Sequence, residues 1–267
     1  MARALAFLVR DLRIEWSYRV QFVLQAGTLL ATILLFYFLA TLIDPAASSH
    51  LAPYGGRYFP FVLIGIVLNG YLGVSLTGFA NRIREAQTTG TLEAMLMSPT
   101  RAVPIALYSA LWDFAYTTAQ VALYGTLGVA FFGVRFGGAD WLAAGLTLAL
   151  TVAAFAGLGL VAAACIVVLK RGNPVAGLAQ ALAALLGGVF YPISVMPEWL
   201  QWLARALPIT YALDAMRRAL LEGEGVAALW LDLVVLAGFA ALLAPLGWWL
   251  FRRAVRRAMV EGTLTHY

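Results

Sequence analysis

The sequence predicts an all-α membrane protein, and its composition and two patterns support this fold class. Hydrophobic residues make up 63% of the 267 residues and charged residues only 12%, about half of the ~25% found in a soluble domain. The apolar residues gather in six long runs, and the arginines crowd into the segments between them. In hydrocarbon each run must pair its own backbone polar groups, which a helix does. We therefore expect one transmembrane permease domain over residues 1–267.

Each of the six runs has about the length, roughly 20 residues, that a helix needs to cross about 30 Å of hydrocarbon. The alternating pattern of a membrane β-barrel is absent from the sequence. The expected spans are residues 21–43, 58–80, 104–132, 141–169, 175–191 and 229–251.

The basic residues are distributed unequally between the two sides of these spans. Most of the 18 lysines and arginines fall in the terminal segments and in the second and fourth connections, which share one side. Cytoplasmic segments are enriched in Lys and Arg, so both termini are expected in the cytoplasm and the chain in the cell membrane as a multi-pass protein. The net charge of +5 thus indicates topology and contact with membrane lipid, and we expect no nucleic-acid partner.

Residues 1–20 show helical spacing of apolar side chains. Leu5, Leu8, Leu12 and Trp16 share one stripe, while the arginines of this segment lie elsewhere. Such a pattern is typical of an amphipathic helix that lies in the membrane interface.

The cytoplasmic segment 81–101 is built unlike a plain linker. Gly90 permits a break, Thr91 is a suitable helix cap, and a short apolar face follows before Pro99. Lipid headgroups or a soluble partner must cover that face. The residues expected at such a contact are Glu85, Thr91, Leu92, Glu93, Met95 and Leu96.

The segment 192–220 lies on the predicted external side, yet it is mostly apolar. Pro192, Pro197 and Pro208 divide it into short pieces, and Trp199 and Trp202 share one stripe at helical spacing. We expect two short re-entrant helices that close the external end, because irregular backbone at membrane depth must be shielded by protein.

Three polar residues lie inside predicted spans. Asp113 would cost about 2.5 to 3.5 kcal/mol if it were ionised at the centre of a span, so it must face protein or water. It is either a substrate or proton contact, or a buried carboxylate bonded to a neighbouring side chain. Asn69 and Gln120 are weaker candidates, since such residues more often form hydrogen bonds between helices.

The sequence lacks the motifs of several enzyme classes. It contains no phosphate-binding loop, no HExxH and no GxSxG, and its histidines, His50 and His266, lie far apart in the sequence. The single cysteine, Cys165, excludes an intrachain disulfide or a thiolate cluster within this chain. We expect the chain alone to be no enzyme and to bind no metal or cofactor.

Three segments together resemble the type-2 ABC exporter permeases, which include drug, antibiotic-resistance, polysaccharide and nodulation-factor exporters. They are EAQTTGTLEAMLMSPTR at 85–101, the segment 190–220, and EGTLTHY at 261–267. The resemblance implies that residues 88–98 form a coupling helix against a separate ATP-binding subunit. It further implies that residues 1–20 form a connecting helix and that 192–220 belong to an external gate.

From this resemblance we expect a six-helix subunit that pairs with a second copy or a homologue and recruits two cytoplasmic ABC ATPase subunits. ATP and Mg would then bind to those subunits, and the complex would act as an ATP-hydrolysing translocase. The expected cargo is amphipathic, lipid-linked or drug-like, and the mechanism is alternating access. The alternatives are an ATP-independent secondary transporter or channel that uses Asp113, and a membrane anchor without transport.

Overall fold

The computed structural model describes residues 19–42, 45–54, 56–88, 102–134, 136–169 and 174–260. Within these ranges the chain contains helices and no β-strand. The long helices are α2 (Arg19–Leu42), α3 (Tyr58–Thr88), α5 (Ala102–Phe132), α6 (Trp141–Leu169), α7 (Pro174–Leu186) and α10 (Trp230–Val260). The shorter elements are η1 (Pro45–Tyr54), η2 (Ile193–Val195), α8 (Glu198–Arg205), α9 (Pro208–Arg217) and η3 (Arg218–Glu222).

The prediction of an all-helical fold is confirmed for the described residues. A helix occupies the place of each predicted span, and three of the described helices are long and apolar enough to cross a membrane: Tyr58–Gly78, Trp141–Val167 and Trp230–Arg257. The count of six spans and the orientation of the termini remain predictions.

Three helices have C-terminal ends that differ by five or more residues from the expected ones. α10 continues to Val260 rather than ending at residue 251. α3 continues to Thr88, so the first part of the predicted cytoplasmic segment 81–101 belongs to the same helix as the span before it. α7 ends at Leu186 rather than at residue 191, because Gly188 adopts φ of +83° and turns the chain away from the helix axis. A side chain at Gly187 would also meet the carbonyl oxygen of Ala183 at 2.4 Å.

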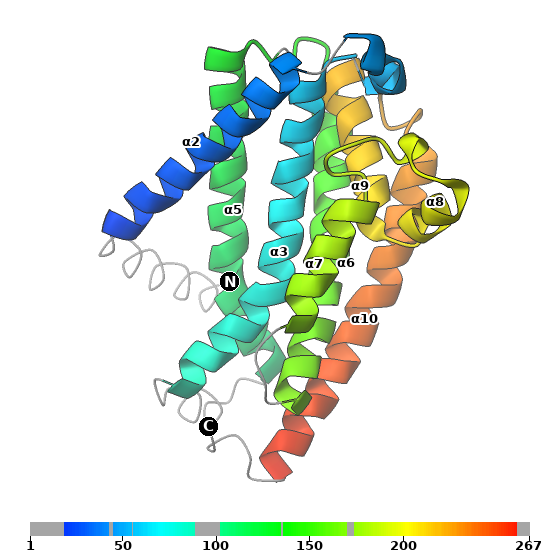
Figure 1. Ribbon diagram of the computed structural model, residues 1–267. Helices are drawn as coiled ribbons and strands as arrows, with labels where there is room; N and C mark the ends of the chain where they lie inside the picture. Colours follow the sequence, from blue (N-terminus) through cyan, green and yellow to red (C-terminus); the bar gives the residue numbers. More distant parts are fainter. Residues whose placement is uncertain are drawn as a thin grey trace.

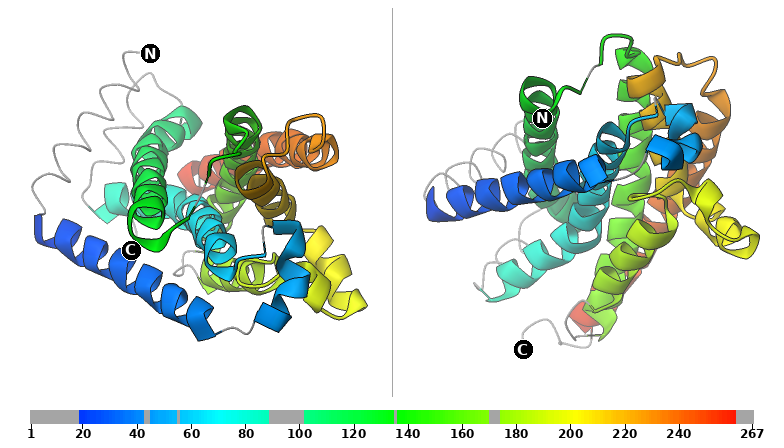
Figure 2. Two further views of the ribbon diagram at one scale, coloured as in Figure 1. Left: turned by 90° about the horizontal axis from the view of Figure 1, so that it is seen from above. Right: turned by 45° about the horizontal axis from the view of Figure 1, so that its top comes forward.

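α3 is the central helix of the bundle (Figure 1). It packs against α2, α5, α6, α7 and α9, and its residues Phe61, Leu68 and Tyr71 are almost completely buried. The view along the bundle shows the other long helices arranged around it, with α8 projecting at the edge (Figure 2). α3 therefore contacts most of the other helices, whereas α10 packs mainly against α6 and α9.

α6 and α10 form the most extensive helix pair, and glycines allow their close approach. A Cβ atom placed on Gly157 of α6 would lie 2.5 Å from the carbonyl carbon of Leu243, and one on Gly247 of α10 would lie 2.4 Å from the carbonyl oxygen of Gly157. Close backbone approach at small residues is the usual source of helix association in lipid, where burial of apolar surface gives no driving force.

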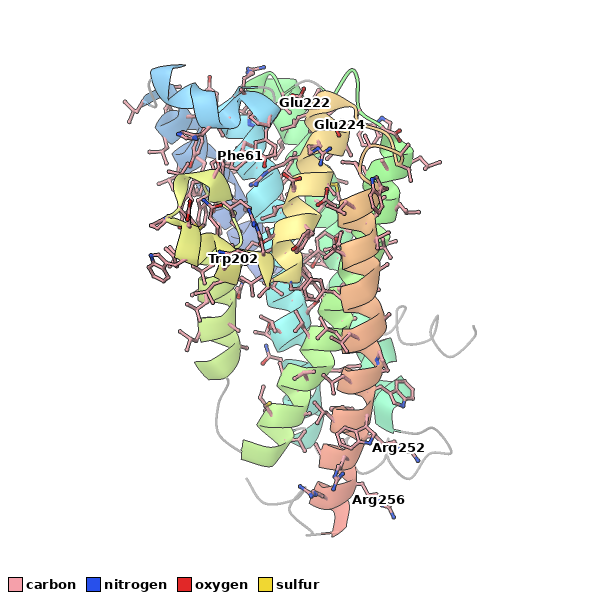
Figure 3. All side chains as sticks on the ribbon, turned by 90° about the vertical axis from the view of Figure 1, so that its right-hand side faces the viewer. Phe61, Trp202, Glu222, Glu224, Arg252 and Arg256 are labelled. Carbon is pink, nitrogen blue, oxygen red and sulfur yellow. The ribbon has the colours of Figure 1, made fainter. Side chains whose placement is uncertain are left out.

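One end of the bundle, here named the η1 end, carries η1, η3 and the connection between α5 and α6. At this end the amide of Asp140 donates to the carbonyl of Ala219, and the carboxylate of Asp140 accepts the amide of Ala143 at the start of α6. α10 finishes at the opposite end, which carries Arg252 and Arg256, whereas Glu222 and Glu224 lie at the η1 end (Figure 3). The arginines at 252–257 and the pair at 217–218 thus lie at opposite ends of the bundle. The distribution of basic residues in the sequence predicts this separation.

We predict that Gly157→Leu weakens the bundle. The new side chain would collide with the backbone of α10, and overpacking of this kind costs about 1–3 kcal/mol in free energy of unfolding. Gly238→Leu on the exposed face of α10 is the matched control, since a Cβ atom there meets no other atom within 4 Å. Thermal unfolding in detergent should show a lower midpoint for Gly157→Leu only. Equal midpoints would contradict the close packing of α6 on α10.

Candidate functional site

The predicted coupling residues lie mostly outside the described part of the chain. Glu85 belongs to the last turn of α3, and only its backbone is described. Thr91, Leu92, Glu93, Met95 and Leu96 lie outside the described residues. Their contact with a partner therefore remains a prediction.

Asn69 lies on the side of α3 that faces α7. The side-chain amide of Gln180 on α7 donates to the carbonyl of Asn69 at 3.5 Å, and a Cβ atom at the neighbouring Gly73 would lie 2.4 Å from Gln180 Nε2. Gly73 thus leaves room for Gln180 between the helices. The buried Oδ1 atom of Asn69 has no hydrogen-bond partner among the described residues.

Asp113 lies elsewhere, where α5 crosses α3. Its side chain is half-buried, and its Oδ2 atom lies 3.1 Å from the position of a Cβ atom at Gly78. Asn69 and Gly78 are nine residues apart on α3, which corresponds to about 14 Å at ~1.5 Å per residue. Gln120 is half-buried on α5, two turns beyond Asp113. Asp113 is therefore well separated from Asn69 along the bundle, and the three predicted polar residues form no single cluster.

The predicted gate residues border two short helices, as expected. Pro197 precedes α8, and Pro208 begins α9, where a proline needs no hydrogen-bonding amide. Pro192 and Pro208 are buried, whereas Trp199 and Trp202 point away from the bundle on α8 (Figure 3 labels Trp202), with exposed fractions of 66% and 71%. Two short helices are therefore present in this segment, while their re-entrant position in the membrane and their gating role remain predictions.

Arg217, at the end of α9, is the residue that ties this segment to the bundle. Its guanidinium is buried and donates three hydrogen bonds to backbone carbonyls: Nε to Phe61 at 3.1 Å, Nη1 to Gly188 at 2.8 Å, and Nη2 to Val189 at 2.9 Å. The donors therefore join α9 to α3 and to the turn after α7. Gly65 of α3 makes this possible, since a Cβ atom there would lie 2.2 Å from the Val189 carbonyl oxygen.

Aromatic rings complete the surroundings of Arg217. Its Cζ atom lies 3.4 Å from the centroid of the Phe61 ring and 5.9 Å from that of Tyr54. Burial lowers the pKa of Arg217 to about 9, against the opposing influence of Tyr54 and Asp214, so the side chain is still a cation at neutral pH. A planar donor group with a permanent charge suits three converging carbonyls better than a lysine would.

A second polar cluster lies directly beside Arg217 at the η1 end. Arg218 forms ion pairs with Asp214 at 3.4 Å, Glu224 at 2.5 Å and Asp232 at 3.2 Å. Tyr54 of η1 donates to Asp214 at 2.6 Å, and burial together with the Asp214 charge raises the pKa of Tyr54, which keeps this donor protonated. These contacts link η1, α9, η3 and the start of α10.

Sequence reasoning missed the roles of Arg217 and Arg218, which lie in the segment 192–220 that is predicted to be external. A signal was present, because two adjacent arginines and Asp214 occur in a stretch that is otherwise apolar. The acceptors of Arg217 could not be found in the same way. They are backbone carbonyls from positions 61, 188 and 189, and no residue type marks a backbone acceptor.

We predict that Arg217→Met destabilises the protein strongly, because three buried carbonyls lose their donors. Each buried polar group left without a partner costs about 1–3 kcal/mol, so the loss should reach at least about 2 kcal/mol. Arg205→Met on the exposed side of α8 is the control and should change stability little. Thermal unfolding in detergent would report the difference, and equal effects would refute the role of Arg217.

The family of the chain can be established from its sequence together with this architecture. The family model described as ABC-2 type transporter matches residues 5–221, which is most of the chain. A search of curated proteins found no match. The matched region includes α2 to α9 and the Arg217 site, and the described helices include three with the length and apolar composition of membrane spans. The chain is therefore a membrane protein of the ABC-2 type transporter family.

Proposed function

We propose that this chain is the permease subunit of an ATP-driven exporter. The observation that carries the proposal is the family match over residues 5–221, because ABC-2 membrane domains normally work with ATPase partners. The chain has no phosphate-binding loop of its own. ATP and Mg would bind to two cytoplasmic ABC ATPase subunits, and hydrolysis would be an activity of the assembled complex.

The length of α3 supports the transmission of movement from the proposed ATPase contact to the proposed gate. This helix contains 31 residues and is about 46 Å long at ~1.5 Å per residue. Near its first turn Phe61 accepts a hydrogen bond from Arg217, and after its last residue the chain enters the proposed coupling helix at 88–98. ATP-driven movement of that segment would displace α3 and, through Arg217, the α8–α9 pair, which we assign as the external gate.

The proposed complex contains a second copy of the chain or a homologue, so that two permeases enclose the pathway. Asn69, Gln120 and Asp113 are candidate contacts for the cargo. Asn69 is supported by its buried oxygen, which lacks a partner among the described residues. An apolar, aromatic chain favours an amphipathic, lipid-linked or drug-like cargo, which would be moved outward by alternating access from the cytoplasm or inner leaflet.

We predict that Leu92→Asp combined with Leu96→Asp removes the ATPase subunit from the complex. Two carboxylates would destroy the apolar face that the proposed contact buries. The protein is extracted from native membranes in detergent, and co-purifying nucleotide-binding proteins are identified by mass spectrometry. Ala227→Asp with Ala228→Asp, at exposed positions of the η1 end, is the matched control and should keep the partner. Absence of any ATPase with the wild-type chain would overturn the proposal.

A secondary transporter or channel is the competing function, because Asp113 is half-buried within a predicted span. We predict that transport by reconstituted complexes needs ATP and survives collapse of the proton gradient by an ionophore. The expected residual rate is at least about half, because a carboxylate that does not relay protons gives the gradient no coupling role. Transport without ATP that is lost with the ionophore and with Asp113→Asn would favour the competing function.

A further inference from the structure

We propose that the groove between α5 and α6 binds one acyl chain of a membrane phospholipid. The site is a cavity of about 240 Å³ enclosed by α3, α5, α6 and the segment from α9 to η3. α5 and α6 both pack on α3 but scarcely on each other, although they are consecutive in the chain. Figure 1 shows them standing apart with α3 between them.

The walls of the cavity are apolar and its floor is buried. Ile64, Leu68 and Tyr71 of α3 form the floor and are at most 5% exposed. The hydroxyl of Tyr71 donates to Thr118 at 2.8 Å, so it offers no donor to a guest. A cavity of 150 Å³ with similar walls stays dry and takes up apolar guests, so this larger space favours hydrocarbon over water.

The mouth of the cavity opens sideways, between the two helices. Its edges are Gly125 on α5 and Gly145 on α6, and a Cβ atom at either position would meet no other atom within 4 Å. Both helices also carry exposed apolar side chains on their outer faces, including Leu123 on α5 and Leu146 on α6. In a membrane such a surface faces lipid tails, which places acyl chains directly at the opening.

The η1 end of the cavity fits a phospholipid headgroup. Trp141 lines the cavity there with 66% of its surface exposed, and its ring packs edge-on against Phe136. Exposed tryptophans at helix ends favour the headgroup layer. Arg57 donates to the carbonyl of Gly133 in the same connection at 3.1 Å and forms no ion pair with a described residue. Its charge is complementary to a lipid phosphate above the chain held in the cavity.

The volume limits the guest to part of a lipid. Sites for whole drug-sized ligands occupy about 300–1,000 Å³, so about 240 Å³ suits one chain segment. The proposal concerns a lipid that stays bound beside α3, separate from the cargo pathway of the exporter, and it holds whether or not that proposed function is correct.

The test uses the full-length protein in phosphatidylcholine vesicles that contain a phosphatidylcholine with a photoreactive group at the end of one acyl chain. After irradiation, mass spectrometry maps the labelled residues. Labelling should concentrate at Val121 and Leu148, which line the cavity. Gly125→Leu or Gly145→Leu should reduce it by about tenfold, equivalent to ~1.4 kcal/mol, because the new side chain occupies the mouth. Arg57→Gln should reduce it severalfold.

Gly238→Leu is the control, since it adds the same side chain to an exposed helix position away from the cavity. It should leave the labelling unchanged. Unfolding midpoints show whether each variant is folded, and the two mouth positions provide independent variants. Cavity labelling no stronger than that of the exposed α10 residues Val234 and Leu242 would overturn the proposal. Crosslinks from the cavity to a second copy of the chain instead of lipid would overturn it as well.

Discussion

The structure depends on one requirement, that backbone polar groups in an apolar setting find partners within the protein. Helices meet this requirement along their length but not at the turn after α7, where the chain leaves the helix at Gly187 and Gly188. Arg217 supplies the missing donors to Gly188 and Val189 and adds a third bond to Phe61. The buried Arg217 cation thus allows an irregular turn to follow the short α7 inside the bundle.

As a result, the two ends of α3 are held in the bundle by different kinds of contact. In its first turns, the ring of Phe61 packs on the buried guanidinium of Arg217, which also lies near the ring of Tyr54. The ion pairs around Arg218 lie next to these contacts. Farther along, α3 contacts α5 through the Tyr71–Thr118 bond and through the approach of Asp113 to Gly78. A displacement of the far end would therefore be passed to the α8–α9 segment, which Arg217 holds against α3, rather than being lost in a loose loop.

Much of the fold follows from the sequence, because apolar runs of membrane length must be helical and because Pro197 and Pro208 fix where α8 and α9 begin. The candidate site follows only in part. Trp199 and Trp202 share a short helix, as their spacing predicts, but the burial of Arg217 depends on carbonyls contributed by distant segments. The α5–α6 cavity depends on helix spacing, which hydropathy does not encode. The residues at 91–96, which the sequence marks most clearly, lie outside the described part.

The pairing of α6 with α10 has a consequence for how the protein is made. The two helices are separated in the sequence by α7, α8 and α9, and Gly157 has its partner surface at Leu243 and Ala244. Chains are synthesised from the N-terminus, and contacts between distant segments form late. The face of α6 that carries Gly157 therefore stays uncovered in the membrane until α10 is inserted. During that interval the nascent protein depends on lipid, or on the insertion machinery, to cover the surface that α10 later occupies.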